Sequence, residues 1–223
     1  MAEEKRKGVI IEFDFAAAEG AKVLYKATEK VLKDNEIDFS TRIEAQYLAG
    51  GNYFGGLREY FAAIKSKKAP DKIAKELAAR FSADIAAVVP KAVTADFKAF
   101  VKRLLEKGLR VVVATRANLD SVRSAFAEFD SPDFDLYQEV SNVYGSVKWD
   151  AWRRAAVSNH LISYCTLAVA GSGYSVKGAL LAGMGVVGVM NDHVAYQDFG
   201  GANEIFTKLD ASAADKVCRV MKV

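Results

Sequence analysis

The amino-acid sequence predicts an α/β protein: a parallel β-sheet covered by helices on both faces, with an all-helical segment inserted after the first strand. In the second half of the chain, short β-branched and apolar runs alternate with segments of helical periodicity. Such alternation is typical of parallel strands joined by helical crossovers. Between residues 19 and 88 the apolar residues recur only at helical spacing. A chain of 223 residues with 51% hydrophobic content can bury a core of the size that this fold needs.

The first predicted strand, residues 8–11, follows a charged tail and carries a β-branched run, which indicates burial on both faces of a sheet. Glu12 and Asp14 come next. Two residues apart on an extended segment, their side chains are expected on the same side, at the carboxyl end of the strand, where open α/β sheets place their sites. Acidic residues also simply end strands, and this stretch alone leaves both interpretations open.

The inserted segment predicts three helices. The first ends at Asn35, the second lies near residues 57–64, and the third begins at Pro70. We therefore divide the chain into an α/β core, residues 1–18 and 89–223, and a helical cap, residues 19–88, with Pro90 marking the return to the core. The apolar positions that support these helices are Val23, Ala27, Val31, Leu32, Leu57, Tyr60, Phe61, Ile64, Ile73, Leu77, Phe81 and Ile85.

The rest of the chain predicts alternating helices and strands. A helix capped by Thr94 ends at Gly108. The strands expected after it are residues 109–115, 136–140, 165–170 and 186–190, and the helices between them are residues 119–129, 149–160 and 176–182.

Composition excludes several classes of protein. The net charge is +3, from 31 basic and 28 acidic residues, so the chain lacks the basic footprint of a nucleic-acid binder. Cys165 and Cys218 have neither a disulfide framework nor metal-ligand spacing. The longest apolar run, residues 179–190, is broken by glycines and is too short to span a bilayer. We therefore expect a cytoplasmic protein that binds neither nucleic acid nor membrane.

The order of motifs resembles a known superfamily. An acid-x-acid pair after the first strand, a helical insertion, the run GLRVVVAT ending at Thr115, Lys148, and the run GALLAGMGVVGV after Gly171 follow one another along nearly the whole chain. This order resembles the haloacid dehalogenase (HAD) superfamily, and within it the β-phosphoglucomutase-like branch. The resemblance implies a Rossmann-like parallel-sheet core with an inserted helical cap.

The resemblance also implies roles for individual residues. Family members use a first aspartate as the nucleophile and a second, two positions later, as general acid/base; Glu12 and Asp14 stand at these positions. Thr115 is implied to hydrogen-bond the phosphoryl oxygens, Lys148 to neutralise charge on nucleophile and phosphate, and Arg116 is close enough in sequence to reach an anion.

Two cap residues, Tyr53 and Arg58, are expected in a glycine-bracketed loop of the cap, where the resembling branch recognises substrate. Solvated or packed side chains are the alternative interpretation for both. Asn118, just after the phosphate motif, could equally cap the helix that follows it.

Three departures from the family pattern affect catalysis. Glu12 replaces the nucleophilic aspartate, Ala170 and Gly171 stand where an acidic residue holds Mg²⁺, and Phe15 stands where glycine is usual. Glu12 and Asp14 remain as ligands, so we expect Mg²⁺ binding to be weak or absent. If only the nucleophile and the metal anchor are missing, Glu12→Asp with Gly171→Asp should restore part of the hydrolysis.

Two hypotheses follow. In the first, the chain keeps the fold and is a catalytically impaired binding protein for a small phosphorylated metabolite or a protein partner, with Lys148 pairing with Glu12 and Asp14 as a metal-free ion cluster. In the second, it is an active Mg²⁺-dependent phosphatase or phosphomutase that acts on a small phosphorylated metabolite, with Glu12 as nucleophile or metal ligand.

Overall fold

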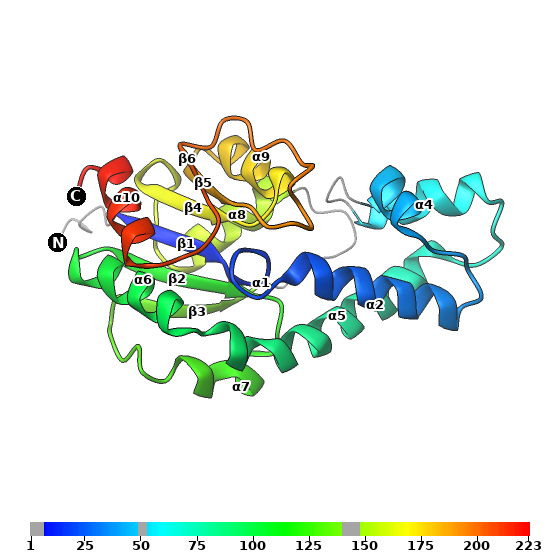
Figure 1. Cartoon of the computed structure of the whole chain (residues 1–223), viewed down its shortest axis with the longest axis horizontal. Coiled ribbons are helices and arrows are strands. Elements are labelled where there is room, and N and C mark those ends of the chain that lie inside the picture. The colour runs from blue at the N-terminus through cyan, green and yellow to red at the C-terminus, as the bar shows by residue number, and fades with distance from the viewer. Residues whose placement is uncertain (1–6, 49–52, 140–147) are drawn as a thin grey trace.

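The computed structural model describes residues 7–48, 53–139 and 148–223, and confirms an α/β fold around a parallel sheet (Figure 1). Within these residues the six strands lie in the order β3-β2-β1-β4-β5-β6, and each pairs with its neighbours in parallel. The strands are β1 (Gly8–Glu12), β2 (Arg110–Thr115), β3 (Phe134–Gln138), β4 (Thr166–Ala170), β5 (Gly185–Val189) and β6 (Glu204–Phe206).

The first strand lies in the middle of the sheet. Ile10 is in register with Val112 of β2 and Ala168 of β4. Because strand side chains alternate between faces, Val9 and Ile11 enter one apolar cluster and Ile10 enters the other. Both faces of β1 are therefore buried, as its β-branched run predicts.

Helices cover both faces of the sheet. The cluster on the Val9 face includes side chains of α6 and α10, which pack against each other, and the cluster on the Ile10 face includes side chains of α8 and α9, which also pack together. The helices are α1 (Phe13–Ala16), α2 (Gly20–Asp34), α3 (Thr41–Ile43), α4 (Tyr53–Ala63), α5 (Pro70–Ala92), α6 (Ala95–Glu106), α7 (Leu119–Val122), α8 (Lys148–Ser158), α9 (Gly173–Leu181) and α10 (Ala211–Met221), with a π-helical turn at Glu44–Leu48 and 3₁₀ turns at Arg123–Phe126 and Ser163–Cys165.

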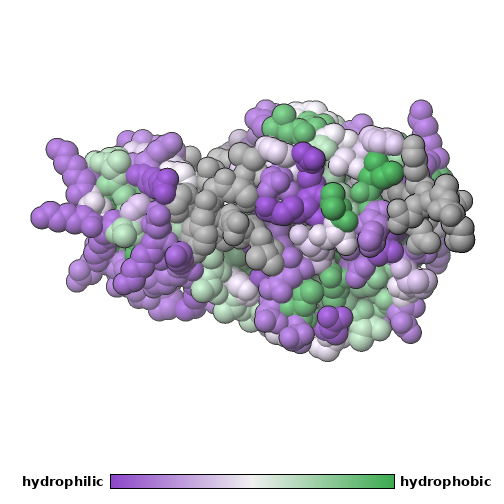
Figure 2. Space-filling view, turned by 180° about the vertical axis from the view of Figure 1, so that it is seen from behind, coloured by the Kyte–Doolittle hydropathy of each residue, from purple (hydrophilic) through white to green (hydrophobic). Residues whose placement is uncertain are grey.

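Residues 20–48 and 53–80, which we call the helical extension, project from the sheet (Figure 1). Its helices enclose a third apolar cluster, separate from the two at the sheet, and the face visible in Figure 2 is mostly hydrophilic. α5 takes part in two clusters, because Ile73 and Leu77 pack within the extension whereas Phe81 and Ile85 pack against the sheet. The boundary predicted at residue 88 falls inside α5, and the division into core and cap stays a prediction.

Local signals for helix ends were reliable. Thr94 and Asn118 cap α6 and α7 through their side chains, Asn35 ends α2, Pro70 begins α5, and Gly108 follows α6 with a φ of +71°. These details confirm the predictions.

Two expectations about helices were wrong, and several elements were not expected. The helix predicted at residues 119–129 is only α7 followed by the 3₁₀ turn, and α5 continues through Pro90, where the missing N–H costs a single bond in the last turn. Elements α1, α3, β6 and α10 were not predicted. None of the helices in the described ranges is both long enough and apolar enough to cross a membrane.

Candidate functional site

Three strands bring the candidate residues to one edge of the sheet. Glu12 ends β1, Thr115 ends β2 and Ala170 ends β4, and these strands are neighbours. Glu12 and Asp14 are both buried, with 3% and 1% of their surface exposed. Buried carboxyl groups need hydrogen-bond donors around them, so their partners define what this site can do.

The expected geometry of the acidic pair is wrong in one respect. Asp14 does not continue the strand, because β1 ends at Glu12 and the chain turns at once into the short helix α1. The two carboxyl groups consequently have different neighbours. Glu12 Oε2 accepts a hydrogen bond from the Gly171 N–H at 3.0 Å, on the first residue after β4.

Asp14 accepts hydrogen bonds on both carboxylate oxygens. The Thr115 hydroxyl donates to Oδ1 at 2.6 Å, and the Arg116 backbone N–H donates to Oδ2 at 2.8 Å. Thr115 Oγ1 in turn accepts from the Ala117 N–H at 3.1 Å. Burial raises the pKa of Asp14 from 3.8 to about 6, although Arg116 and Thr115 act in the opposite direction.

The Arg116 guanidinium lies between two carboxyl groups. Its Nη1 is 3.8 Å from Asp14 Oδ2, and its Nη2 is 3.2 Å from Glu139 Oε1. The guanidinium also lies over the Phe15 ring at 5.2 Å and the Phe81 ring at 6.0 Å. Burial lowers the pKa of Arg116, but the nearby carboxylates outweigh burial and raise it overall.

Glu139 was not singled out from the sequence. The predicted strand at residues 136–140 placed it inside the strand, whereas β3 ends at Gln138. An acidic residue just past the carboxyl end of a parallel strand was the available signal. Ser82 was also missed: its hydroxyl on α5 donates to the Arg116 carbonyl at 2.8 Å.

Gly171 lies against the backbone of α1. A Cβ at this position would lie 2.2 Å from the Phe15 carbonyl carbon and 2.5 Å from the Ala16 nitrogen. Backbone atoms cannot give way as a flexible side chain can. A side chain at position 171 therefore requires α1 to move, and the repair by Glu12→Asp with Gly171→Asp stays a prediction.

The structure leaves the predicted roles of Tyr53, Lys148 and Arg58 untested. Tyr53 begins α4 and Lys148 begins α8, so Tyr53 lies in a helix rather than a loop, but both side chains fall outside the described residues. Arg58 pairs with Asp71 at 3.4 Å. Asp71 is at the start of α5, about 15 Å along the helix from Phe81. A role for Arg58 in substrate recognition stays a prediction.

A cavity beside Glu12 lies between the sheet and α8. The empty space there, open solvent included, is about 220 Å³. Tyr137, Glu139 and Trp152 contribute to its lining. Trp152 is packed rather than presented to a ligand, because its indole N–H donates to the Ser175 carbonyl at 3.1 Å. No group of three His, Cys, Asp or Glu side chains that could hold a metal ion is found in the described parts of the chain.

No family model matches the sequence, and no curated protein matches it either. Solved structures match the fold over nearly the whole chain. β-Phosphoglucomutase from Clostridium difficile is 11% identical, with 97% of this chain and 96% of that chain covered and a TM-score of 0.70. CbbY from Rhodobacter sphaeroides, in complex with phosphate, is 16% identical, with 92% and 95% covered and a TM-score of 0.64.

A haloacid dehalogenase-like protein of unknown function from Agrobacterium tumefaciens is 14% identical, with 96% and 99% covered and a TM-score of 0.61. Identities this low establish likeness of fold alone. The strand order, the helices on both faces and these matches agree with one another. The chain therefore has the fold of the HAD-like hydrolases, as the order of its motifs implied.

Proposed function

We propose that this chain is a HAD-fold binding protein that has lost Mg²⁺-dependent phosphoryl transfer. One observation carries the proposal: the backbone of α1 occupies the space beside Gly171, within 2.2 Å of where a side chain would begin. The position implied to anchor the metal therefore has no carboxylate and no room for one. The packing of α1 therefore excludes a carboxylate metal ligand at position 171.

The remaining residues do not fit Mg²⁺. This ion requires near-octahedral oxygen ligands at 2.0–2.1 Å and is reluctant to give up water. Both oxygens of Asp14 accept protein donors, and Glu12 Oε2 accepts the Gly171 N–H. Without a divalent cation, a phosphate approaching Glu12 meets a like charge, which costs about 4 kcal/mol at 4 Å for an effective dielectric of 20. These features support a site that does not form an aspartyl-phosphate equivalent.

The proposed ligand is a small phosphorylated metabolite. CbbY, with the same fold, has been crystallised with phosphate, and a mutant of CbbY with xylulose-1,5-bisphosphate. Thr115, Arg116 and Lys148 remain the proposed phosphate contacts of this chain, with Thr115 and Arg116 exchanging part of their contact with Asp14 for the ligand.

A turnover assay tests the loss of catalysis. The protein is incubated with p-nitrophenyl phosphate in excess Mg²⁺, in chelator, and as the Glu12→Ala variant. We expect the same background rate in all three. Mg²⁺-dependent turnover that Glu12→Ala abolishes would instead establish the alternative, an active phosphatase or phosphomutase that uses Glu12.

A binding assay tests the ligand class. Thermal unfolding is measured with inorganic phosphate, with small sugar phosphates and with the same sugars unphosphorylated. We expect the melting temperature to rise only with the phosphorylated compounds, and to rise less in Lys148→Ala. Equal responses to phosphorylated and unphosphorylated sugars, or none at all, would contradict the metabolite and favour a protein partner.

A further inference from the structure

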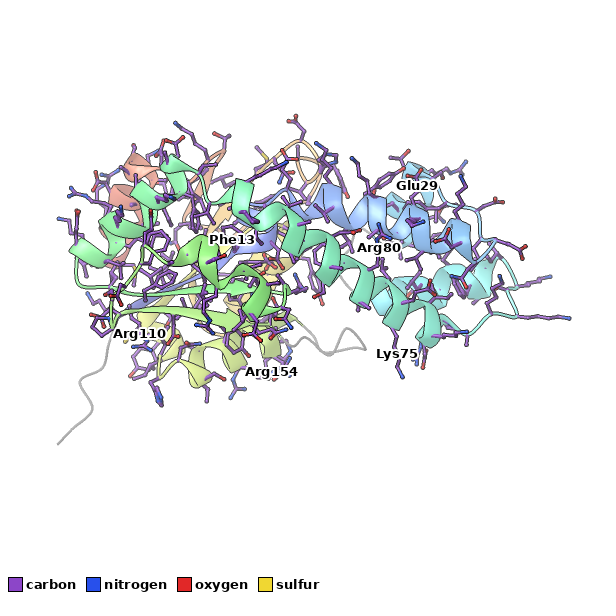
Figure 3. All side chains as sticks on the ribbon, turned by 90° about the horizontal axis from the view of Figure 1, so that it is seen from below. Phe13, Glu29, Lys75, Arg80, Arg110 and Arg154 are labelled. Atoms are coloured by element: carbon purple, nitrogen blue, oxygen red, sulfur yellow. The ribbon has the colours of Figure 1, made fainter. Side chains whose placement is uncertain are left out.

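Helix α5 connects the helical extension to the site edge of the sheet. It runs without a break from the extension, where Lys75 and Arg80 are labelled, to the sheet (Figure 3). Ser82, two residues after Arg80, donates its hydroxyl to the Arg116 carbonyl at 2.8 Å. Because the two residues are 34 positions apart, this bond is a tertiary contact between α5 and the first residue after β2.

The Ser82 hydroxyl is committed to this contact. A hydroxyl has one hydrogen to donate, and serine inside a helix commonly gives it to the carbonyl four residues earlier in the same helix. Ser82 gives it to Arg116 instead. Beside this bond, the Phe81 ring lies 5.9 Å from the Phe15 ring, and the Arg116 guanidinium lies over both rings. Helix α5 therefore contacts both the backbone and the side chain of Arg116.

The backbone of Arg116 is held on both sides of its Cα. Its N–H donates to Asp14 Oδ2 at 2.8 Å, and its carbonyl accepts from Ser82. The parallel pairing of β2 with β3 ends one residue earlier, at Thr115, so the sheet does not fix this position. Because each peptide group is planar, holding both groups sets the direction of the Arg116 N–H and of its side chain.

We propose that Ser82 is a positioning residue for phosphate binding, because its hydrogen bond keeps Arg116 in the orientation in which it meets the anion. The inference rests on the proposed function, in which a phosphate takes over part of the contacts that Asp14 now makes. The Arg116 N–H then exchanges its acceptor, whereas the Ser82 bond persists because Asp14 takes no part in it. Ser82 thus stabilises the phosphate contact without touching the ligand.

The experiment measures phosphate binding in three variants. Thermal unfolding is followed at rising concentrations of inorganic phosphate, with NaCl at equal ionic strength as the reference. Ser82→Ala removes the hydroxyl, and Ser82→Thr keeps it. Ser121→Ala is the control: Ser121 lies in the connection that follows β2, and its exposed hydroxyl donates to the nearby Asn118 carbonyl at 2.6 Å, with no contact from α5.

We expect Ser82→Ala to need about five times more phosphate than the parent protein for half of the maximal rise in melting temperature. Ser82→Thr and Ser121→Ala should need the same concentration as the parent. An unchanged concentration in Ser82→Ala, or an equal increase in Ser121→Ala, would overturn the proposal. A folded Ser82→Thr that binds as weakly as Ser82→Ala would also overturn it, because packing of α5 rather than the hydroxyl would then be responsible. A parent protein that does not respond to phosphate would contradict the proposed function itself, and this inference with it.

Discussion

The two sides of the sheet's carboxyl edge surround their carboxyl groups in different ways. On the β2 side, Thr115 and Arg116 still surround Asp14 with donors, and every one of these contacts is polar. On the β4 side, Gly171 contributes only a backbone N–H to Glu12, and the chain of α1 lies against it. One side surrounds a buried carboxylate with hydrogen-bond donors, and the other is filled by backbone packing.

The β4 side is therefore limited by the position of the α1 backbone as well as by its residue types. An exchanged side chain can be restored by one mutation, whereas a backbone in van der Waals contact cannot move without disturbing the core that holds it. Phe13, the first residue of α1, is fully buried and packs edge-on against Phe97 and Phe126. The position of α1 is therefore fixed by the main apolar cluster. Substitutions on the two sides of the edge should consequently change the stability of the fold by different amounts.

The largest effect is expected at Gly171. Gly171→Ala places a Cβ within 2.5 Å of two backbone atoms of Phe15 and Ala16 and should lower the free energy of unfolding by about 3 kcal/mol. Gly185→Ala is the control, because its Cβ would have no neighbour closer than 3.8 Å, and it should change stability by less than about 0.5 kcal/mol. Urea unfolding measures both. Equal effects of the two substitutions would show that the β4 side is open.

The second effect is a pH dependence on the β2 side. The pKa of Asp14 is raised from 3.8 to about 6 by burial, so the folded protein binds this proton more tightly than the unfolded chain does. This contribution to stability is full below about pH 4 and is lost as the pH rises to about 6, a change of about 3 kcal/mol at most. Asp14→Asn should flatten the stability profile between these pH values in urea unfolding. A profile that keeps the parent's slope in the variant would assign the titration to another group.

A smaller loss is expected at Thr115. Thr115→Val keeps the shape but leaves Asp14 Oδ1 without its donor and the Ala117 N–H without its acceptor, which should cost about 2 kcal/mol. Thr28→Val is the control, because that buried hydroxyl donates only to the Leu24 carbonyl of its own helix, and about 0.5 kcal/mol is expected. Similar losses for both would mean that the Asp14 contact adds little to stability.

The sequence predicted the sheet well because its signals are local. The β-branched runs around Ile10 and Val112 are long enough to identify buried strands, and cap residues such as Thr94 identify helix starts. The motifs also led correctly to one edge of the sheet. These features depend on neighbours within a few positions, where periodicity and capping are informative.

The contacts within the site could not be predicted from local sequence patterns. That Glu139 pairs with Arg116, and that the Phe15 backbone lies against Gly171, depends on how β3, α1 and β4 meet in space. The spacing of residues along the chain does not determine such contacts between distant elements. The end of β3 one residue before Glu139 was enough to change an expected strand residue into a site residue.

The smallest effect is expected at Arg58, which lies in α4 and not at either side of the sheet edge. Arg58 and Asp71 are both more than half exposed and pair at 3.4 Å, so Arg58→Ala should cost about 0.5 kcal/mol or less in urea unfolding. Because the pair lies at the far end of α5 from Phe81, the response of the melting temperature to phosphorylated sugars should also stay as in the parent protein. A ligand response that falls in Arg58→Ala while stability does not would contradict this expectation. It would show that α4 of the helical extension contacts the ligand when the ligand is bound.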